Sequence, residues 1–183
     1  TQTSSLEFSH FPVMLSEIIQ IASPEKGGLF IDCTFGGGSY SNALLKFPKT
    51  KVIGIDRDEA VISRANELQK KYQKRFKFYQ IKFSELDKIL NKNADTIIFD
   101  LGLSSIQLKN LNRGFSFKSK NKLDMAMGLN NISAQEAINN LSEKHLKLII
   151  KILGEEIEAS NIAKNIIKAR SEKKITKVNE LVK

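Results

Sequence analysis

Short apolar runs alternate with amphipathic stretches through the first hundred residues, and this alternation predicts a parallel α/β fold. Four runs have the length and composition of buried strands: residues 29–33, 51–56, 76–81 and 96–101. Apolar positions at helical spacing between them predict helices over residues 13–22, 39–47 and 59–71, and a short one over 83–90. Because strands joined by helices in this way run parallel, we expect ligands at the carboxyl ends of the strands.

The pattern changes after residue 101. Residues 102–128 show neither helical nor strand periodicity, and a loop this long in a compact chain is usually functional or disordered. Helices are then predicted from the capping box Ser133–Glu136, over 143–153 with Gly154 as its stop, over 156–170, and after a cap at Thr176. We therefore expect two domains, residues 1–107 and 108–183.

Three consecutive glycines, residues 36–38, follow the first predicted strand, and Ser39 is expected to cap the next helix. A strand, a glycine loop and a helix in this order present backbone N–H groups to a ligand. Glycine suits such a loop because it allows close approach and positive φ. By itself the motif is also compatible with an ordinary tight turn.

Acidic residues stand at the ends of three predicted strands: Asp32, Asp56 and Asp100. Asp56, twenty residues after Gly36, is placed to accept hydrogen bonds from ribose hydroxyls. The alternative is a surface carboxylate that follows a turn. Together the glycine loop and Asp56 favour a cofactor that contains adenosine.

Two features distinguish between adenosine cofactors. A dinucleotide site usually has a third glycine, and here the run continues as Ser39-Tyr40-Ser41. Asp32 would repel a pyrophosphate and attract the cationic methionine end of S-adenosylmethionine (SAM). The sequence therefore favours a methyltransferase over a NAD-dependent oxidoreductase.

Composition limits the remaining choices. The chain of 183 residues has a net charge of +9, of which residues 101–183 carry +7 (15 Lys and Arg against 8 Asp and Glu). This excess favours a polyanionic partner for the second half, although a lysine-rich composition bias would also produce it. One cysteine excludes a disulfide framework and a thiolate metal cluster. No apolar run reaches membrane-spanning length and no secretory signal is visible, so we expect a cytoplasmic protein.

Three stretches together resemble a known family. They are Asp32–Gly38, Asp100–Gln107, and Arg113–Phe117 with Leu123–Met125. With His10–Val13 and Gly154–Glu156, they make the whole chain similar to the bacterial small-subunit (16S) ribosomal RNA cytosine-N4 methyltransferases of the MraW type. The resemblance implies a Rossmann-like SAM-binding domain, residues 1–107, and an inserted helical domain on the substrate side, residues 108–183. It also implies that the last strands of the sheet are missing from this chain.

The resemblance implies N4-methylation of a cytidine in the decoding centre of 16S rRNA. SAM would become S-adenosylhomocysteine, and no metal is expected. The partner would be the small-subunit rRNA within the assembled subunit. No membrane partner is expected, and the protein could form a homodimer. With the glycine loop, the implied SAM-binding residues are Gly36, Gly38, Ser39, Tyr40, Asp56, Phe83, Asp100 and Gln107. Phe83 would stack on the adenine or, alternatively, belong to the core.

Methyl transfer to cytosine N4 benefits from a group that accepts hydrogen bonds from the amine. Asp100 is the first candidate, although it could instead hold the methionine amine of SAM, and Asp124 is the second, with loop ordering as its alternative role. Phe115 and Phe117 would sandwich an unstacked base or pack in the core. Phosphate contacts are expected from Arg113, Lys118, Lys120 and Lys122.

This chain departs from the family pattern at two places. Ser39-Tyr40 replaces Gly-His, and Ala126 replaces an arginine that could contact RNA. With the missing strands, these departures support one alternative function: an RNA-binding relative whose catalysis is impaired.

Overall fold

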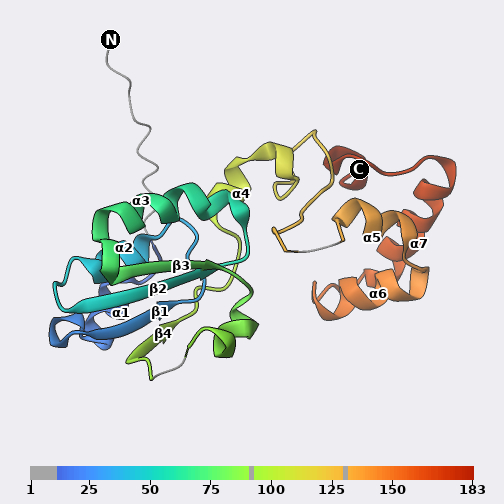
Figure 1. The fold of residues 1–183 in the computed structure, drawn as a ribbon. Helices are drawn as coiled ribbons and strands as arrows, with labels where there is room; N and C mark the ends of the chain where they lie inside the picture. The colour runs from blue at the N-terminus through green and yellow to red at the C-terminus, as the bar shows by residue number, and fades with distance from the viewer. Residues whose placement is uncertain (1–11, 91–92, 130–131) are drawn as a thin grey trace, which may run out of the picture. The chain divides into compact units, whose positions relative to one another are not determined.

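The computed structural model describes residues 12–90, 93–129 and 132–183. The chain divides into two compact units, residues 1–106 and 107–183 (Figure 1). The division lies one residue before the expected domain boundary. His10 and Phe11, which belong to the first motif of the resemblance, lie outside the described residues.

The first unit is built on a parallel sheet with the strand order β3-β2-β1-β4. Its strands are β1 (Gly28–Asp32), β2 (Thr50–Asp56), β3 (Phe76–Gln80) and β4 (Thr96–Ile98). This order is that of a Rossmann-like fold. The predicted α/β class and all four predicted strands are confirmed.

The fourth strand is shorter than predicted because the chain leaves the sheet after Ile98. The backbone N–H of Asp100 donates to Thr34 Oγ1 at 2.8 Å, instead of to a neighbouring strand. The apolar run continues through Phe99 and Leu101, but both side chains are exposed. These residues therefore form a loop at the carboxyl end of the strand.

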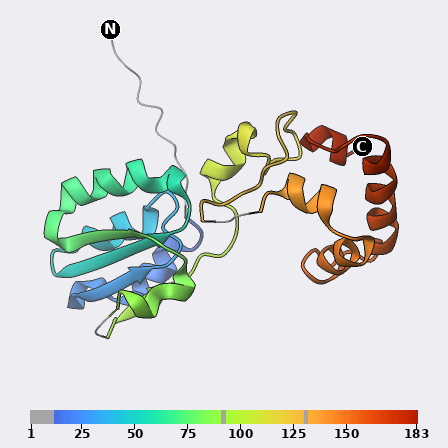
Figure 2. The same ribbon diagram turned by 45° about the vertical axis from the view of Figure 1, so that its right-hand side comes forward.

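Helices cover one face of the sheet in both ribbon views (Figures 1 and 2). They are α1 (Leu15–Ala22), α2 (Ser39–Leu45) and α3 (Ile62–Tyr72), and they pack on a core that includes Phe30, Val52 and Phe76. On the other face, Ile31, Cys33 and Ile55 pack against residues of the 3₁₀ helix η4 (Phe83–Lys88) and the segment after it. Further 3₁₀ helices are η1 (Pro24–Lys26), η2 (Glu59–Val61) and η3 (Gln73–Arg75). The buried Cys33 is thus a core residue, and burial raises the pKa of its thiol to about 11.

The second unit is helical, as predicted. It contains most of α4 (Ser105–Lys109), then η5 (Leu111–Arg113), α5 (Ala134–Asn140), α6 (Glu143–Ile152), α7 (Ala159–Glu172) and α8 (Val178–Leu181). Its core includes Leu123, Leu146 and Ile166. The capping box before α5 is confirmed: Glu136 N–H donates to Ser133 Oγ at 3.2 Å, and Ser133 N–H donates to the Glu136 carboxylate at 2.8 Å.

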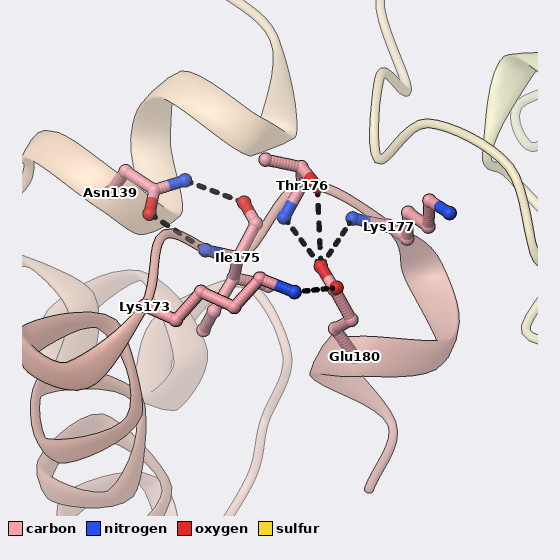
Figure 3. A network of polar contacts seen from close by, with 6 residues as sticks. All are labelled: Asn139, Lys173, Ile175, Thr176, Lys177 and Glu180. Carbon is pink, nitrogen blue, oxygen red and sulfur yellow. Dashed lines mark hydrogen bonds and ion pairs between the residues drawn. The ribbon is translucent and has the colours of Figure 1, made fainter.

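Two predicted caps are wrong. Gly38, with φ +72°, occupies the N-cap position of α2, and Ser39 is already the first helical residue. Lys177, not Thr176, occupies the N-cap position of α8, where the Glu180 carboxylate accepts from the backbone N–H groups of both residues (Figure 3).

The helix α6 ends before Gly154, as predicted, but the reason is different. Glu155, with φ +52°, is the left-handed residue after this helix. A Cβ on Gly154 would lie 2.7 Å from the carbonyl oxygen of Ile150. Glycine is therefore needed at this position for close packing against the helix end.

Among the described residues, none of the helices combines the length and apolar character needed to span a membrane.

Candidate functional site

The glycine loop is anchored in the core by Phe35. The ring of Phe35 lies 5.7 Å from that of Phe76 and 5.3 Å from that of Phe78. A Cβ on Gly38 would lie 2.6 Å from Phe35 Cζ, and a Cβ on Gly54 would lie 2.8 Å from Phe35 Cδ2. Gly38 thus allows Phe35 to pack beneath the loop, a role that differs from the predicted contact with a cofactor.

Two of the loop amides are used inside the protein. Gly36 N–H donates to Asp56 Oδ2 at 2.9 Å, and Gly38 N–H donates to the carbonyl oxygen of Phe35 at 2.7 Å. Gly37 is different, because it is exposed and, apart from its two chain neighbours, no described residue has an atom within 4 Å of the position where a Cβ would be. The open position of the loop is therefore Gly37, which was not among the predicted site residues although it belongs to the glycine run.

Asp56 ends β2, as predicted, and its carboxylate holds the loop. Besides Gly36, the N–H of Asp58 donates to it, at 2.9 Å to Oδ1. A carboxylate has about four acceptor positions, so the described residues leave about two of them unused. Asp56 is only partly buried. It can therefore order the glycine loop and still accept hydrogen bonds from a ligand.

Asp32 is buried and has no surface for contact with a ligand, which contradicts its expected role of attracting the methionine end of SAM. It is completely buried, Ser41 Oγ donates to its Oδ2 at 2.7 Å, and its Oδ1 is buried without a hydrogen-bond partner among the described residues. Burial raises the pKa of this carboxyl to about 6, against the opposing effects of Ser41 and the backbone amide of Thr34. Asp32 thus connects β1 to α2 behind the loop.

Asp100 stands beside the same loop, with its side chain exposed. Its position is fixed by the hydrogen bond to Thr34 and by Tyr40, whose hydroxyl oxygen lies 3.3 Å from Asp100 Oδ2. The same hydroxyl donates to the carbonyl oxygen of Val13 at 2.6 Å, so its single hydrogen is shared between Val13 and Asp100, and the bond to Val13 is the shorter one. Burial and the Asp100 carboxylate raise the pKa of Tyr40 to about 12, so the phenol stays protonated.

Tyr40 was expected to contact the cofactor directly, but only 4% of it is exposed and its ring belongs to the core. It reaches the site through its hydroxyl.

Two exposed aromatic residues follow the carboxyl ends of strands, at the edge of the sheet where the glycine loop, Asp56 and Asp100 lie. Phe83 follows β3 and Phe99 follows β4; they are 45% and 50% exposed, and their rings make an edge-to-face contact at 5.5 Å between centroids. Phe99 was missed because the sequence assigned it to the interior of a strand. Such a pair offers an apolar surface to a planar ligand.

Gln107 begins the second unit and lies in α4, where only 6% of it is exposed. Burial leaves little of its surface for a ligand.

The substrate residues predicted in the second unit differ in exposure. Phe115 is 9% exposed, and the Arg113 guanidinium lies 5.2 Å from its ring centroid and donates to the carbonyl oxygen of Ala126 at 2.7 Å. Both residues are therefore engaged in holding the long loop, which favours the packing alternative. Phe117, by contrast, is 74% exposed.

Asp124 orders the loop through its backbone, because its carbonyl oxygen accepts from Ala134 N–H at 2.7 Å. Its side chain is partly exposed. Within residues 12–90, 93–129 and 132–183, no three His, Cys, Asp or Glu side chains gather in a group that could hold a metal ion.

Comparison with known proteins places these features in a family. A family model described as the MraW methylase family matches residues 7–183. The ribosomal RNA small subunit methyltransferase H of Orientia tsutsugamushi (strain Boryong) is 43% identical over 174 residues, which cover 94% of this chain and 56% of that protein. The protein of the same name from Rickettsia massiliae is 41% identical, with 94% and 57% covered.

The chain thus spans a little over half the length of the curated relatives that it matches. The family model matches nearly the whole chain, residues 7–183, and the fold has the parallel sheet and glycine loop described above, so the chain belongs to the MraW methylase family.

Proposed function

We propose that this chain acts in SAM-dependent methylation of 16S rRNA, at N4 of a cytidine in the decoding centre. One structural observation carries the proposal: two hydrogen bonds hold Asp56 and Asp100 beside the glycine loop. Gly36 N–H donates to the Asp56 carboxylate at the end of β2, and the backbone N–H of Asp100, in the loop after β4, donates to Thr34 Oγ1. The methyltransferase family and the names of the relatives support the reaction class and the rRNA substrate.

The residues at this edge fit an adenosine cofactor. Gly37 leaves open space over the loop, and Asp56 has unused acceptor positions for the ribose hydroxyls. Phe83, with Phe99 beside it, offers an exposed apolar surface for the adenine. Gly38 and Tyr40 shape the site from beneath.

When bound, SAM supplies a methyl group activated by its sulfonium. Cytosine N4 is a poor nucleophile because its lone pair is delocalised into the ring. A carboxylate that accepts hydrogen bonds from the amine favours the pyramidal geometry needed for attack, and positioning provides most of the rest. We assign this acceptor role to Asp100, because it is exposed and fixed in place by Thr34 and Tyr40.

Asp100 could instead hold the methionine amine of the cofactor, and Asp124 would then be the acceptor. The two assignments differ in what Asp100→Asn changes. As the acceptor of the amine hydrogens, Asp100 affects the rate of transfer, whereas a contact with the methionine amine affects cofactor affinity. Asp124→Asn is the matched variant, because its backbone contact with Ala134 does not depend on the carboxylate.

Labelled methyl transfer from SAM to undermethylated small ribosomal subunits tests the proposal. We expect incorporation at one cytidine, with Asp100→Asn about 100-fold slower at saturating SAM and Asp124→Asn much less affected. The absence of incorporation, together with RNA binding that weakens with salt, would instead support the RNA-binding relative with impaired catalysis. Ala126, which replaces the arginine of the family pattern, favours that second candidate.

A further inference from the structure

Two distant lysines meet in the second unit. Lys122 and Lys177 form an isolated antiparallel bridge, in which Leu123 N–H donates to the carbonyl oxygen of Thr176 at 2.9 Å and Val178 N–H donates to that of Asn121 at 3.1 Å. The hydrogen bonds lie on either side of the lysine pair. In such a non-hydrogen-bonded pair the opposing side chains come closest, so the bridge places the two lysine side chains next to each other.

The two lysine charges are not neutralised by the described residues. Both side chains are exposed, and neither takes part in an ion pair of the described residues. The nearby Glu180 carboxylate accepts from the backbone N–H of Lys177 and pairs with the Lys173 ammonium at 3.1 Å, whereas the Lys177 ammonium points away from it (Figure 3). Like charges directly opposite each other destabilise a strand pair, and an anionic partner would relieve this repulsion.

The loop before Lys122 adds an aromatic residue and two further charges. Phe117, Lys118 and Lys120 are all exposed. Between them, Ser119 is 1% exposed, and its Oγ donates to the carbonyl oxygen of Leu111 at 2.6 Å and accepts from Asn121 N–H at 3.0 Å. The loop is therefore held from beneath while Phe117 and the lysines remain accessible.

We propose that Phe117, Lys118, Lys120, Lys122 and Lys177 form a binding surface for single-stranded RNA on the second unit. An unpaired base stacks on Phe117 and the lysines contact the phosphates that flank it. Exposed aromatic residues among cations are typical of single-strand binding, because bases in a duplex have no free face. The inference rests on the proposed function in one respect: the proposed function identifies the polyanion that binds this surface as RNA.

Fluorescence anisotropy with a labelled 12-nucleotide RNA, as a single strand and as a duplex, tests this surface in the 183-residue chain across a range of salt concentrations. Lys122→Gln/Lys177→Gln removes two charges and retains the backbone bridge. Phe117→Ala removes the stacking platform. Lys144→Gln/Lys151→Gln is the control with equal charge loss on α6, which lies at the opposite end of the unit from α8 in both ribbon views (Figures 1 and 2).

We expect the wild-type chain to prefer the single strand. Lys122→Gln/Lys177→Gln should reduce the slope of log K against log salt by about 1.4, since each single-strand phosphate contact contributes about 0.7. Phe117→Ala should weaken binding by about 5- to 150-fold with an unchanged slope. Melting temperatures of the lysine variant should equal or exceed the wild-type value, because repulsion is removed.

Equal binding by the Lys122/Lys177 variant and the wild type would overturn the inference, as would an equal loss in the α6 control or equal affinity for the duplex. The assay contains no SAM, so its result is independent of catalysis. A chain that binds RNA in this way without transferring methyl groups would overturn the proposed function alone.

Discussion

Gly38→Ala should destabilise the first unit strongly, although the change adds one methyl group. Gly38 has φ +72°, a conformation that costs a residue with a Cβ about 1–2 kcal/mol. The new Cβ would also lie 2.6 and 2.8 Å from two ring carbons of Phe35, and such overpacking costs about 1–3 kcal/mol. We therefore expect the free energy of unfolding to fall by about 2–5 kcal/mol.

Gly37→Ala is the matched control one residue away. Gly37 has no positive φ, and none of the described residues beyond its chain neighbours has an atom within 4 Å of the place that the new methyl group would occupy. The free energy of unfolding should therefore change by less than about 0.5 kcal/mol. On the proposed function, the same methyl group enters the cofactor space and weakens cofactor binding. Gly38→Ala should thus lower the free energy of unfolding, whereas Gly37→Ala should leave it nearly unchanged and weaken cofactor binding.

Urea unfolding, monitored by tyrosine fluorescence, reports on the first unit, which contains both glycines. The chain has no tryptophan, and its three tyrosines, Tyr40, Tyr72 and Tyr79, all belong to the first unit. Equal stability losses in the two variants, or a loss below about 1 kcal/mol for Gly38→Ala, would refute the role that we give to Phe35 beneath the loop.

Three further predictions concern buried or anchored polar groups. Tyr40→Phe removes the hydroxyl that donates to Val13 and should lower the free energy of unfolding by about 1 kcal/mol in urea titrations; an unchanged value would contradict the contact. Asp32 has a pKa of about 6 in the fold against an ordinary 3.8, so its charged form is disfavoured and stability is lost as pH rises through this window. Asp32→Asn should avoid this loss, roughly 2–3 kcal/mol between pH 4 and pH 7, and parallel pH profiles of the two proteins would argue against it. The backbone N–H of Thr176, Lys173 and the backbone N–H of Lys177 lower the pKa of Glu180 to about 2 from 4.5, so its contribution is present above pH 4.5 and is lost as pH falls towards 2. The melting temperature measured by circular dichroism should therefore depend less on pH in this range for Glu180→Gln than for the wild type. An identical dependence would contradict the stabilising role of the Glu180 carboxylate.

Local sequence patterns predicted the strands and helices because each depends on neighbouring residues. The apolar run of β1 and the capping box at Ser133 are of this kind. The end of β4 could not be predicted, since it depends on a hydrogen bond between Asp100 and Thr34, which are distant in sequence.

The candidate site could be predicted only where it depends on local sequence. Strand ends located Asp56 and Asp100, but the burial of Asp32 depends on packing behind the loop. Phe115 and Phe117 carry the same side chain two residues apart in an irregular loop. Only Phe115 is buried, beside an Arg113 that is held by the carbonyl oxygen of the more distant Ala126, so the difference depends on how the loop folds. Likewise, only the folded chain brings Lys177 to Lys122.

Calorimetric titration of the chain with S-adenosylhomocysteine, with the wild type and Asp56→Asn in parallel, tests most directly whether the carboxyl edge of the sheet is a cofactor site. We predict that the wild type binds one equivalent and that Asp56→Asn binds at least about tenfold more weakly, since one charged acceptor for the ribose is lost. No heat of binding at millimolar ligand, or equal affinity of the two proteins, would contradict the account.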